Sequence, residues 1–128
     1  MGDIRWYKRD PDAALAGMAE LTLEERGAYN TVLDLIYSRE GNLPDDERAI
    51  VRWMGGNVRT WRRIRRRLIE LGKLYVHAGM LHNGRSDKEI YAAQQRLNVS
   101  ANFALKSKKS ATITRLKFTT PTTRKKER

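Results

Sequence analysis

The stretch that decides the fold reads NVRTWRRIRRRLIELG over residues 57–72 and KLYVHAGMLH over residues 73–82. Asn57 is a residue type that caps a helix N-terminus, and Gly72 suits the left-handed backbone that often follows a helix. The apolar positions between them predict a helix over 58–71. The two short β-prone runs around Ala78 and Gly79 then predict a hairpin with a compact turn.

Two further helices are predicted before this stretch, after a brief helical turn that follows Asp10. Thr22 and Glu25 form a capping box, in which each side chain satisfies a free backbone N–H, so the first long helix should run to about residue 38. Residues 44–47, a proline followed by three acids, suit the start of a second, short helix. We expect that helix to end at the glycine pair 55–56.

A second capping box, Ser86 to Glu89, predicts another helix after the hairpin, over residues 86–106. We therefore predict a mainly α fold with a small β-hairpin. Three helices followed by a hairpin is the order of a winged helix-turn-helix. The domain organisation would be a winged-helix-like domain over 1–85, the C-terminal helix over 86–106, and a flexible basic tail over 107–128, whose last stretch, 119–128, should be disordered when free.

The formal net charge of +11 points to a polyanionic partner. Residues 106–128 carry nine basic residues and one acidic residue, or +8, whereas residues 1–105 carry seventeen and fourteen, or +3. Within that nearly balanced body, six arginines fall in residues 59–67 with no acid among them. The charge therefore forms two separate basic features, a helix and a tail.

The helix over 58–71 divides into two faces at about 100° per residue. One face is apolar and should contact the core: Val58, Trp61, Ile64, Leu68, Ile69 and Leu71. The other carries Glu70 and five arginines: Arg59, Arg62, Arg63, Arg66 and Arg67. Arg65 lies among the apolar positions, so we expect its stem to be packed and its guanidinium to pair with an acid. Trp53 and Trp61 are predicted core anchors.

A helix of roughly 20 Å suits a DNA major groove about 12 Å wide. We predict nucleic-acid contacts from Arg59, Thr60, Arg62, Arg63, Arg66, Arg67 and Lys73, with sequence discrimination limited to Arg59, Thr60, Arg62, Arg63 and Arg66. The tail would add phosphate contacts from Lys106, Lys108, Lys109, Arg115 and Lys117. The alternative for the arginine face is a solvated surface, but solvated helices usually mix charges of both signs.

Several function classes are disfavoured. The chain has no cysteine, and His77 and His82 lack the spacing of a zinc site, so we expect no metal site. No phosphate loop or nucleophile motif occurs, and we expect neither a cofactor nor enzyme activity. The charged residues near the start argue against an export signal, and no apolar run reaches the length of a membrane span. We therefore expect a cytoplasmic protein, associated with the nucleoid if DNA-bound.

The order of several motifs resembles the YdaU-like family of phage and prophage proteins. These motifs are WYKRDP at 6–11, LTLEERGAYNTVLDLIY at 21–37, GNLPDD at 41–46, WRRI at 61–64 and LIELG at 68–72. The resemblance extends to about residue 83. It implies a winged-helix-like domain of the kind placed at the N-terminus of replication-associated phage proteins, with DNA as the partner.

Double-stranded DNA is thus the leading predicted partner, with a role in replication or transcription regulation. Three alternatives remain open. The fold could be a protein-interaction adaptor or inhibitor that docks on an acidic partner. The tail alone could bind RNA. The helix over 86–106 could join two copies into a homodimer, or pack on its own domain in a monomer.

Overall fold

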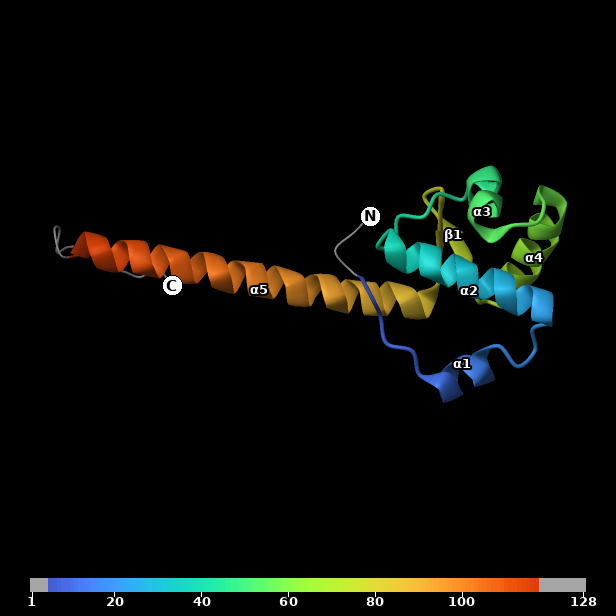
Figure 1. The fold of residues 1–128 in the computed structure, drawn as a ribbon, viewed down its shortest axis with the longest axis horizontal. Coiled ribbons are helices and arrows are strands. Elements are labelled where there is room, and N and C mark those ends of the chain that lie inside the picture. The colour runs from blue at the N-terminus through green and yellow to red at the C-terminus, as the bar shows by residue number, and fades with distance from the viewer. Residues whose placement is uncertain (1–4, 118–128) are drawn as a thin grey trace. The chain divides into compact units, whose positions relative to one another are not determined.

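The computed structural model describes residues 5–117, with side chains described for residues 5–106. The elements are α1 (Pro11–Gly17), α2 (Leu23–Ser38), α3 (Glu47–Met54), α4 (Val58–Glu70), β1 (Tyr75–His77), β2 (Met80–His82) and α5 (Gly84–Lys117) (Figure 1). The fold is mainly helical with a small antiparallel sheet, as predicted. A first compact unit extends to Tyr91 and a second begins at Ala92.

The predicted N-terminal caps of the first helices are present. The Asp10 carboxylate accepts a hydrogen bond from the Ala13 N–H at 3.2 Å at the start of α1. In α2 the Thr22 hydroxyl accepts from the Glu25 N–H at 3.2 Å, and the Glu25 carboxylate accepts from the Thr22 N–H at 2.9 Å. Because both bonds of the capping box form, the start of α2 is defined by local sequence.

The short turn between α3 and α4 is also set by local sequence. Asp46 caps α3 by accepting from the Arg48 N–H at 3.1 Å, and Asn57 caps α4 by accepting from the Thr60 N–H at 2.8 Å. Gly55 ends α3 with a φ of 84°, in the left-handed region that glycine tolerates best. Helix α3 thus stops and α4 starts within three residues.

The hairpin gains a third segment that the sequence did not reveal. Strands β1 and β2 pair antiparallel through a turn at Ala78 and Gly79, both with positive φ. Residues 43–45 pair with the outer side of β2: the Leu81 N–H donates to the Leu43 carbonyl at 2.8 Å, and the Asp45 N–H donates to the Gly79 carbonyl at 3.0 Å. Pro44 forms an isolated bridge with Met80. The connection between α2 and α3 is therefore attached to the hairpin.

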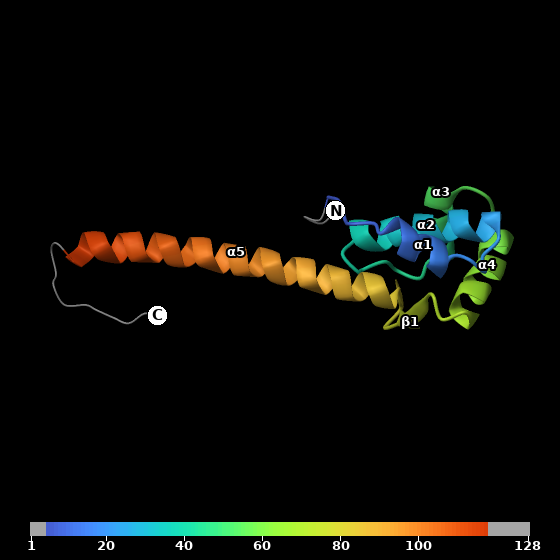
Figure 2. The same ribbon diagram turned by 90° about the horizontal axis from the view of Figure 1, so that it is seen from below.

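The core of the first unit lies where α2 meets α3, α4 and the hairpin. Figures 1 and 2 show α2 between α1 on one side and the α3 and α4 pair on the other. The most completely buried large side chains come from α2, α3, α4, the segment before β1, and β2: Val32, Ile36, Ile50, Trp61, Ile64, Leu68, Leu74 and Leu81. Helix α1, in contrast, contributes no buried residue.

The start and end of α5 differ from prediction. Asn83, rather than Ser86, caps the helix, because the Asn83 side-chain oxygen accepts a hydrogen bond from the Ser86 N–H at 2.8 Å. Ser86 is itself buried, and Ile90 belongs to the core, so the first compact unit continues past the predicted boundary at residue 85. Helix α5 continues to Lys117, past its predicted end at residue 106 and into the segment predicted to be a flexible tail. The disorder predicted for residues 119–128 is not tested. Residues 118–128 of the predicted tail lie outside the described residues.

The second unit is the part of α5 from Ala92 onward. Up to residue 106, where the described side chains end, its large apolar side chains are exposed: Leu97, Val99, Phe103 and Leu105. The predicted homodimer through residues 86–106 is not tested by this arrangement and stays a prediction.

Candidate nucleic-acid interface

Helix α4 separates an apolar face from a basic one. Trp61, Ile64 and Leu68 are buried, with Trp61 only 1% exposed, so its role as a core anchor is confirmed. The opposite side carries four exposed arginines at spacings of three, four and seven residues: Arg59, Arg62, Arg63 and Arg66. We call these four residues the arginine stripe. Because such spacings place side chains on one helix face, the stripe is a continuous surface.

Two members of the stripe, Arg59 and Arg66, are exposed, and their side chains make no hydrogen bond or ion pair with any other described residue. They are therefore available to an external partner without breaking an internal contact. Thr60 lies beside Arg59 and is half-buried, while its backbone N–H is occupied by the Asn57 cap.

Arg62 pairs with Glu47 of α3 through two bonds. Its Nε donates to Oε1 at 2.8 Å and its Nη2 donates to Oε2 at 2.7 Å. The Arg62 side chain nonetheless remains 63% exposed. The guanidinium holds the pKa of Glu47 below its ordinary value through these hydrogen bonds, so the carboxylate is charged at neutral pH.

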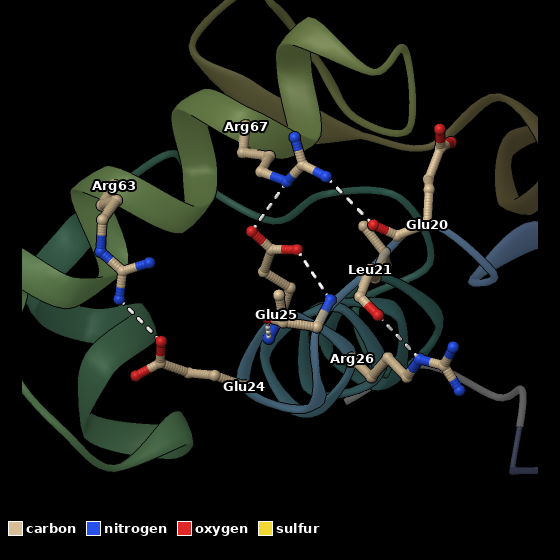
Figure 3. A network of polar contacts seen from close by, with 8 residues as sticks. Glu20, Leu21, Glu24, Glu25, Arg26, Arg63 and Arg67 are labelled. Carbon is tan, nitrogen blue, oxygen red and sulfur yellow. Dashed lines mark hydrogen bonds and ion pairs between the residues drawn. The ribbon is translucent and has the colours of Figure 1, made fainter.

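Arg63 pairs with Glu24 in the first turn of α2, with Nη2 donating to Oε1 at 2.7 Å (Figure 3). Both side chains are 57% exposed. Pairs this exposed contribute about 0–1 kcal/mol to stability because water competes for both charges. Arg62 and Arg63 are thus paired at the surface but open to exchange with another anion.

Arg67 is held more firmly and belongs to the fold. Its Nε contacts the Glu25 carboxylate at 2.8 Å, and its Nη2 donates to the Glu20 carbonyl at 3.0 Å (Figure 3). The Glu25 carboxylate is 5% exposed and also accepts the capping bond from the Thr22 N–H. Arg67 neutralises a buried charge at the start of α2. Its side chain is still 42% exposed, and its contact with nucleic acid stays a prediction.

Arg65 pairs with an acid, Asp45, as the sequence predicted. Its Nε and Nη2 donate to the two carboxylate oxygens of Asp45 at 3.0 and 2.6 Å, and the two side chains are 32% and 20% exposed. This geometry ties α4 to the segment that bridges to the hairpin.

Lys73 was predicted as a nucleic-acid contact, but its side chain is only 15% exposed. Its ammonium lies 3.5 Å from Glu20, and it lines a cavity on a different part of the unit from the stripe's ion pairs. Of the predicted tail contacts, Lys106 is exposed on α5. The side chains of Lys108, Lys109, Arg115 and Lys117 lie outside the described residues.

Trp53 was predicted as a core anchor and this is wrong, because its side chain is 58% exposed. Ile50 makes the buried contact of α3, with Val51 and Met54 partly buried beside it. Trp53 lies at the edge of that apolar face, and the guanidinium carbon of Arg39 lies 5.9 Å from its ring centroid. A cation–π contact therefore covers part of the ring in place of core residues.

The acids opposite the arginines are the part of the site that sequence reasoning missed. Glu20, Glu24, Glu25 and Glu47 come from the approach to α2, its first turn and the start of α3. From the sequence, Glu25 and Glu47 were assigned to helix starts, and Glu20 and Glu24 were given no role. Their spacing along the chain carries no sign of α4, so only the tertiary structure brings them to it.

A family model described as "Protein of unknown function (DUF1376)" matches residues 5–91. The chain belongs to this family. No curated protein and no solved structure matches it. The match ends at the residue that closes the first compact unit, so α4 and its arginine stripe lie inside the DUF1376 region. The family description names no function, and the phage replication role implied by the YdaU resemblance stays a prediction.

Other kinds of site find little support among the described residues. No group of three metal-ligating side chains occurs there. No helix in the same part of the chain is long and apolar enough to cross a membrane.

Proposed function

We propose that this protein binds double-stranded DNA through the arginine stripe of α4. The observation that carries the proposal is the stripe itself: four exposed arginines on one helix face, two of them without any internal partner among the described residues. Four arginines against the carboxylates of Glu47 and Glu24 leave the stripe with an excess of positive charge, which attracts a polyanion. The planar guanidinium suits both phosphate and the guanine edge.

The order of elements supports a winged helix-turn-helix as the scaffold for this contact. Helix α2 is followed by the bridging segment 43–45, then by α3 and α4 across a short turn, and then by the β1–β2 hairpin. In such folds the second helix of the pair enters the major groove. On this proposal α4 is the recognition helix, and its 13 residues span about 20 Å.

The ion pairs of the stripe are compatible with DNA contact. Arg62 and Arg63 hold Glu47 and Glu24 at the surface, where each pair contributes little to stability. A phosphate can therefore replace each carboxylate at small cost. Arg59 and Arg66 would bind first, because no pair has to be broken.

The proposed role is regulation of replication or transcription, as expected for a phage or prophage protein of the YdaU-like type. This role rests on the sequence resemblance, whereas the DNA contact rests on the stripe.

Fluorescence anisotropy with a labelled random-sequence duplex of about 20 base pairs tests the contact. The informative variant is Arg59→Ala with Arg66→Ala. Its matched control is Lys88→Ala with Arg96→Ala, which removes the same charge from two exposed residues of α5 that have no described ion pair. The stripe variant should weaken binding by roughly tenfold or more, and should reduce the slope of log K against log salt by about 1.8, or about 0.9 for each phosphate that is no longer neutralised.

The control should stay within about threefold of the wild type, because distant charges are screened. Equal weakening by both variants would reduce the effect to net charge and contradict the proposal. At about 50 mM salt, phosphate contacts contribute strongly to affinity. If the wild type does not bind the duplex at this salt concentration, the proposal is contradicted outright.

A further inference from the structure

A cavity of about 190 Å³ lies within the first unit, under α1 and beside α2. Its α1 wall is made of Ala13, Ala14 and Gly17, whose small side chains do not fill the space below them. A Cβ atom placed on Gly17 would meet nothing within 4 Å. The cavity therefore follows from the composition of α1, the helix that contributes no buried residue.

The opposite wall is apolar and aromatic. It is formed by Tyr29, Leu33 and Tyr37 of α2, and Tyr7 stacks on Tyr37 with ring centroids 3.7 Å apart. The space would hold about six water molecules at roughly 30 Å³ each, or one ring with a small substituent. Flat apolar groups fit such a wall well.

One polar group of the cavity, the Tyr29 hydroxyl, has no hydrogen-bond acceptor among the described residues. Asn83 donates to the Tyr29 hydroxyl oxygen at 3.1 Å and to the Lys73 carbonyl at 2.8 Å, so its own side-chain N–H groups are used. The Tyr29 O–H in turn has no acceptor among the described residues. It is a hydrogen-bond donor in a cavity wall.

Lys73 supplies the charge. Its side chain is only 15% exposed, yet its ammonium makes no described hydrogen bond, and its one carboxylate neighbour among the described residues, Glu20, lies 3.5 Å away. That distance exceeds the 2.7–3.2 Å, approximately, of a good N–H···O bond. The Lys73 side chain is thus largely packed while its ammonium has a single, rather distant ion-pair partner, and an anion in the cavity would give it a closer one.

The remaining charged groups of the cavity add to this preference. Lys8, Arg9 and Arg85 join Lys73, against the carboxylates of Asp10 and Glu89 in the lining and of Glu20 beside Lys73, which leaves a formal excess of one positive charge. Both carboxylates are occupied, since Asp10 caps α1 and Glu89 accepts from Tyr37 and Arg85. Glu20 is therefore the carboxylate that pairs with Lys73 among the described residues.

We propose that this cavity is a binding site for a small organic anion. A carboxylate or phosphate group would contact the Lys73 ammonium and the Tyr29 hydroxyl, and a flat apolar body would lie against Leu33 and Tyr37. The site is separate from the arginine stripe, so the proposal does not depend on DNA binding. Regulation by a metabolite of this chemical class is what such a site would allow.

Protein NMR with the full ¹⁵N-labelled chain tests the site, with sodium benzoate, phenyl phosphate and neutral benzamide as probes. We expect saturable shifts at the amides of Asn30, Asn83 and Ser86 with one or both anions, and the two anions show which head group is preferred. Benzamide should bind at least about tenfold more weakly, the effect of losing one charge-assisted contact. Saturation by neither anion, or equal binding of benzamide, would overturn the proposal.

Two variants with matched controls locate the site. Lys73→Met removes the ammonium and keeps the stem, and should weaken anion binding about tenfold, while Lys88→Met on exposed α5 surface should not. Ala14→Leu fills the cavity from α1 with every charge retained, and should abolish binding, while Ala16→Leu on the exposed side of α1 should not. Unchanged binding in Ala14→Leu would overturn the proposal even if Lys73→Met failed to fold.

Discussion

Arg65 of α4 and Asp45 of the bridging segment are joined by two hydrogen bonds, of 3.0 and 2.6 Å. The Asp45 backbone N–H donates to the Gly79 carbonyl in the hairpin turn. A single side-chain pair thus connects α4 to the segment that fixes the hairpin. Its partners come from residues 20 positions apart, so it stabilises tertiary structure and not a local turn.

Replacing Arg65 by alanine should destabilise the protein by about 1–2 kcal/mol, because Asp45 keeps its charge and loses both bonds. Urea unfolding followed by circular dichroism measures this. The neighbouring Arg66→Ala is the control and should change the free energy of unfolding by less than about 0.5 kcal/mol, since Arg66 is exposed and has no partner among the described residues. Similar effects of the two substitutions would show that the Arg65 pair is not structural.

Glu25 should make stability depend on acid pH. The hydrogen bond from the Thr22 N–H lowers the pKa of Glu25 from its ordinary 4.5, burial opposes this, and Arg67 adds to the lowering. A lowered folded-state pKa means that the contribution to stability is complete above pH 4.5 and is lost as the pH falls through the folded value. The difference in unfolding free energy between wild type and Glu25→Gln should therefore shrink from pH 7 to pH 3.

The control for this experiment is Glu70→Gln, which removes an exposed carboxylate of α4 that has no ion pair among the described residues. Its difference from wild type should stay nearly constant over the same range. A constant difference for Glu25→Gln as well would mean that the carboxylate contributes nothing through its charge.

Tyr37 should produce the opposite dependence at alkaline pH. Burial, with a further contribution from the hydrogen bond to Glu89, raises the pKa of Tyr37 from 10.0 to about 12. A raised folded-state pKa gives a contribution that is complete below pH 10 and lost as the pH rises toward 12. Urea unfolding at pH 8, 10 and 11 should show wild type losing stability relative to Tyr37→Phe. A gap that stays the same at all three values would contradict this.

Ala78 and Gly79 should respond to substitution with opposite signs. Ala78 has a φ of 52°, which costs a residue with a Cβ about 1 kcal/mol. Ala78→Asn should therefore raise stability by roughly 0.5–1 kcal/mol, since asparagine tolerates this conformation in two-residue hairpin turns. Gly79→Ala, at a φ of 75°, should lower it by about 1 kcal/mol. Thermal unfolding of both variants checks the signs, and two decreases would argue against the turn described.

The parts of the fold that were predictable are those set by residues close in sequence. The capping bonds of Thr22, Asp46 and Asn57 join residues two or three positions apart, so the helix starts follow from local pattern. The buried face of α4 follows from helical periodicity for the same reason. The bridge between Pro44 and Met80 was not predictable, because a segment of three residues with a proline has no strand pattern of its own.

The candidate site was predictable only in part. The helical periodicity of α4 places the arginines on one face, and Arg65 was correctly separated from them. The periodicity does not show that Arg67 neutralises Glu25, or that Lys73 turns toward a cavity. The partners of these two residues, Glu25 and Glu20, lie more than 40 positions away in the chain. Asn83 displaced the predicted cap at Ser86 because its amide fits both the helix start and the Lys73 carbonyl.

The stripe's carboxylates should act as competitors of DNA, if the proposed function is right. Glu47 and Glu24 hold Arg62 and Arg63 in the free protein, so each pair must open before a phosphate binds. Glu24→Gln with Glu47→Gln should tighten duplex binding by roughly three- to tenfold. Each exposed pair is weak, so opening it costs little, but the substitutions also remove two negative charges that would repel the DNA phosphates. Asp12→Asn with Asp34→Asn removes the same charge from exposed acids of α1 and α2 that do not contact α4, and should have an effect below about twofold.

A thermodynamic cycle distinguishes this competition from a general gain in positive charge. In a background carrying Arg62→Ala and Arg63→Ala, the two glutamine substitutions free no arginine, so their effect on affinity should fall to that of the control pair. Anisotropy titrations at one salt concentration give all the required affinities. If the gain persists without the two arginines, the carboxylates act through net charge, and the ion pairs seen across α2, α3 and α4 have no part in DNA binding.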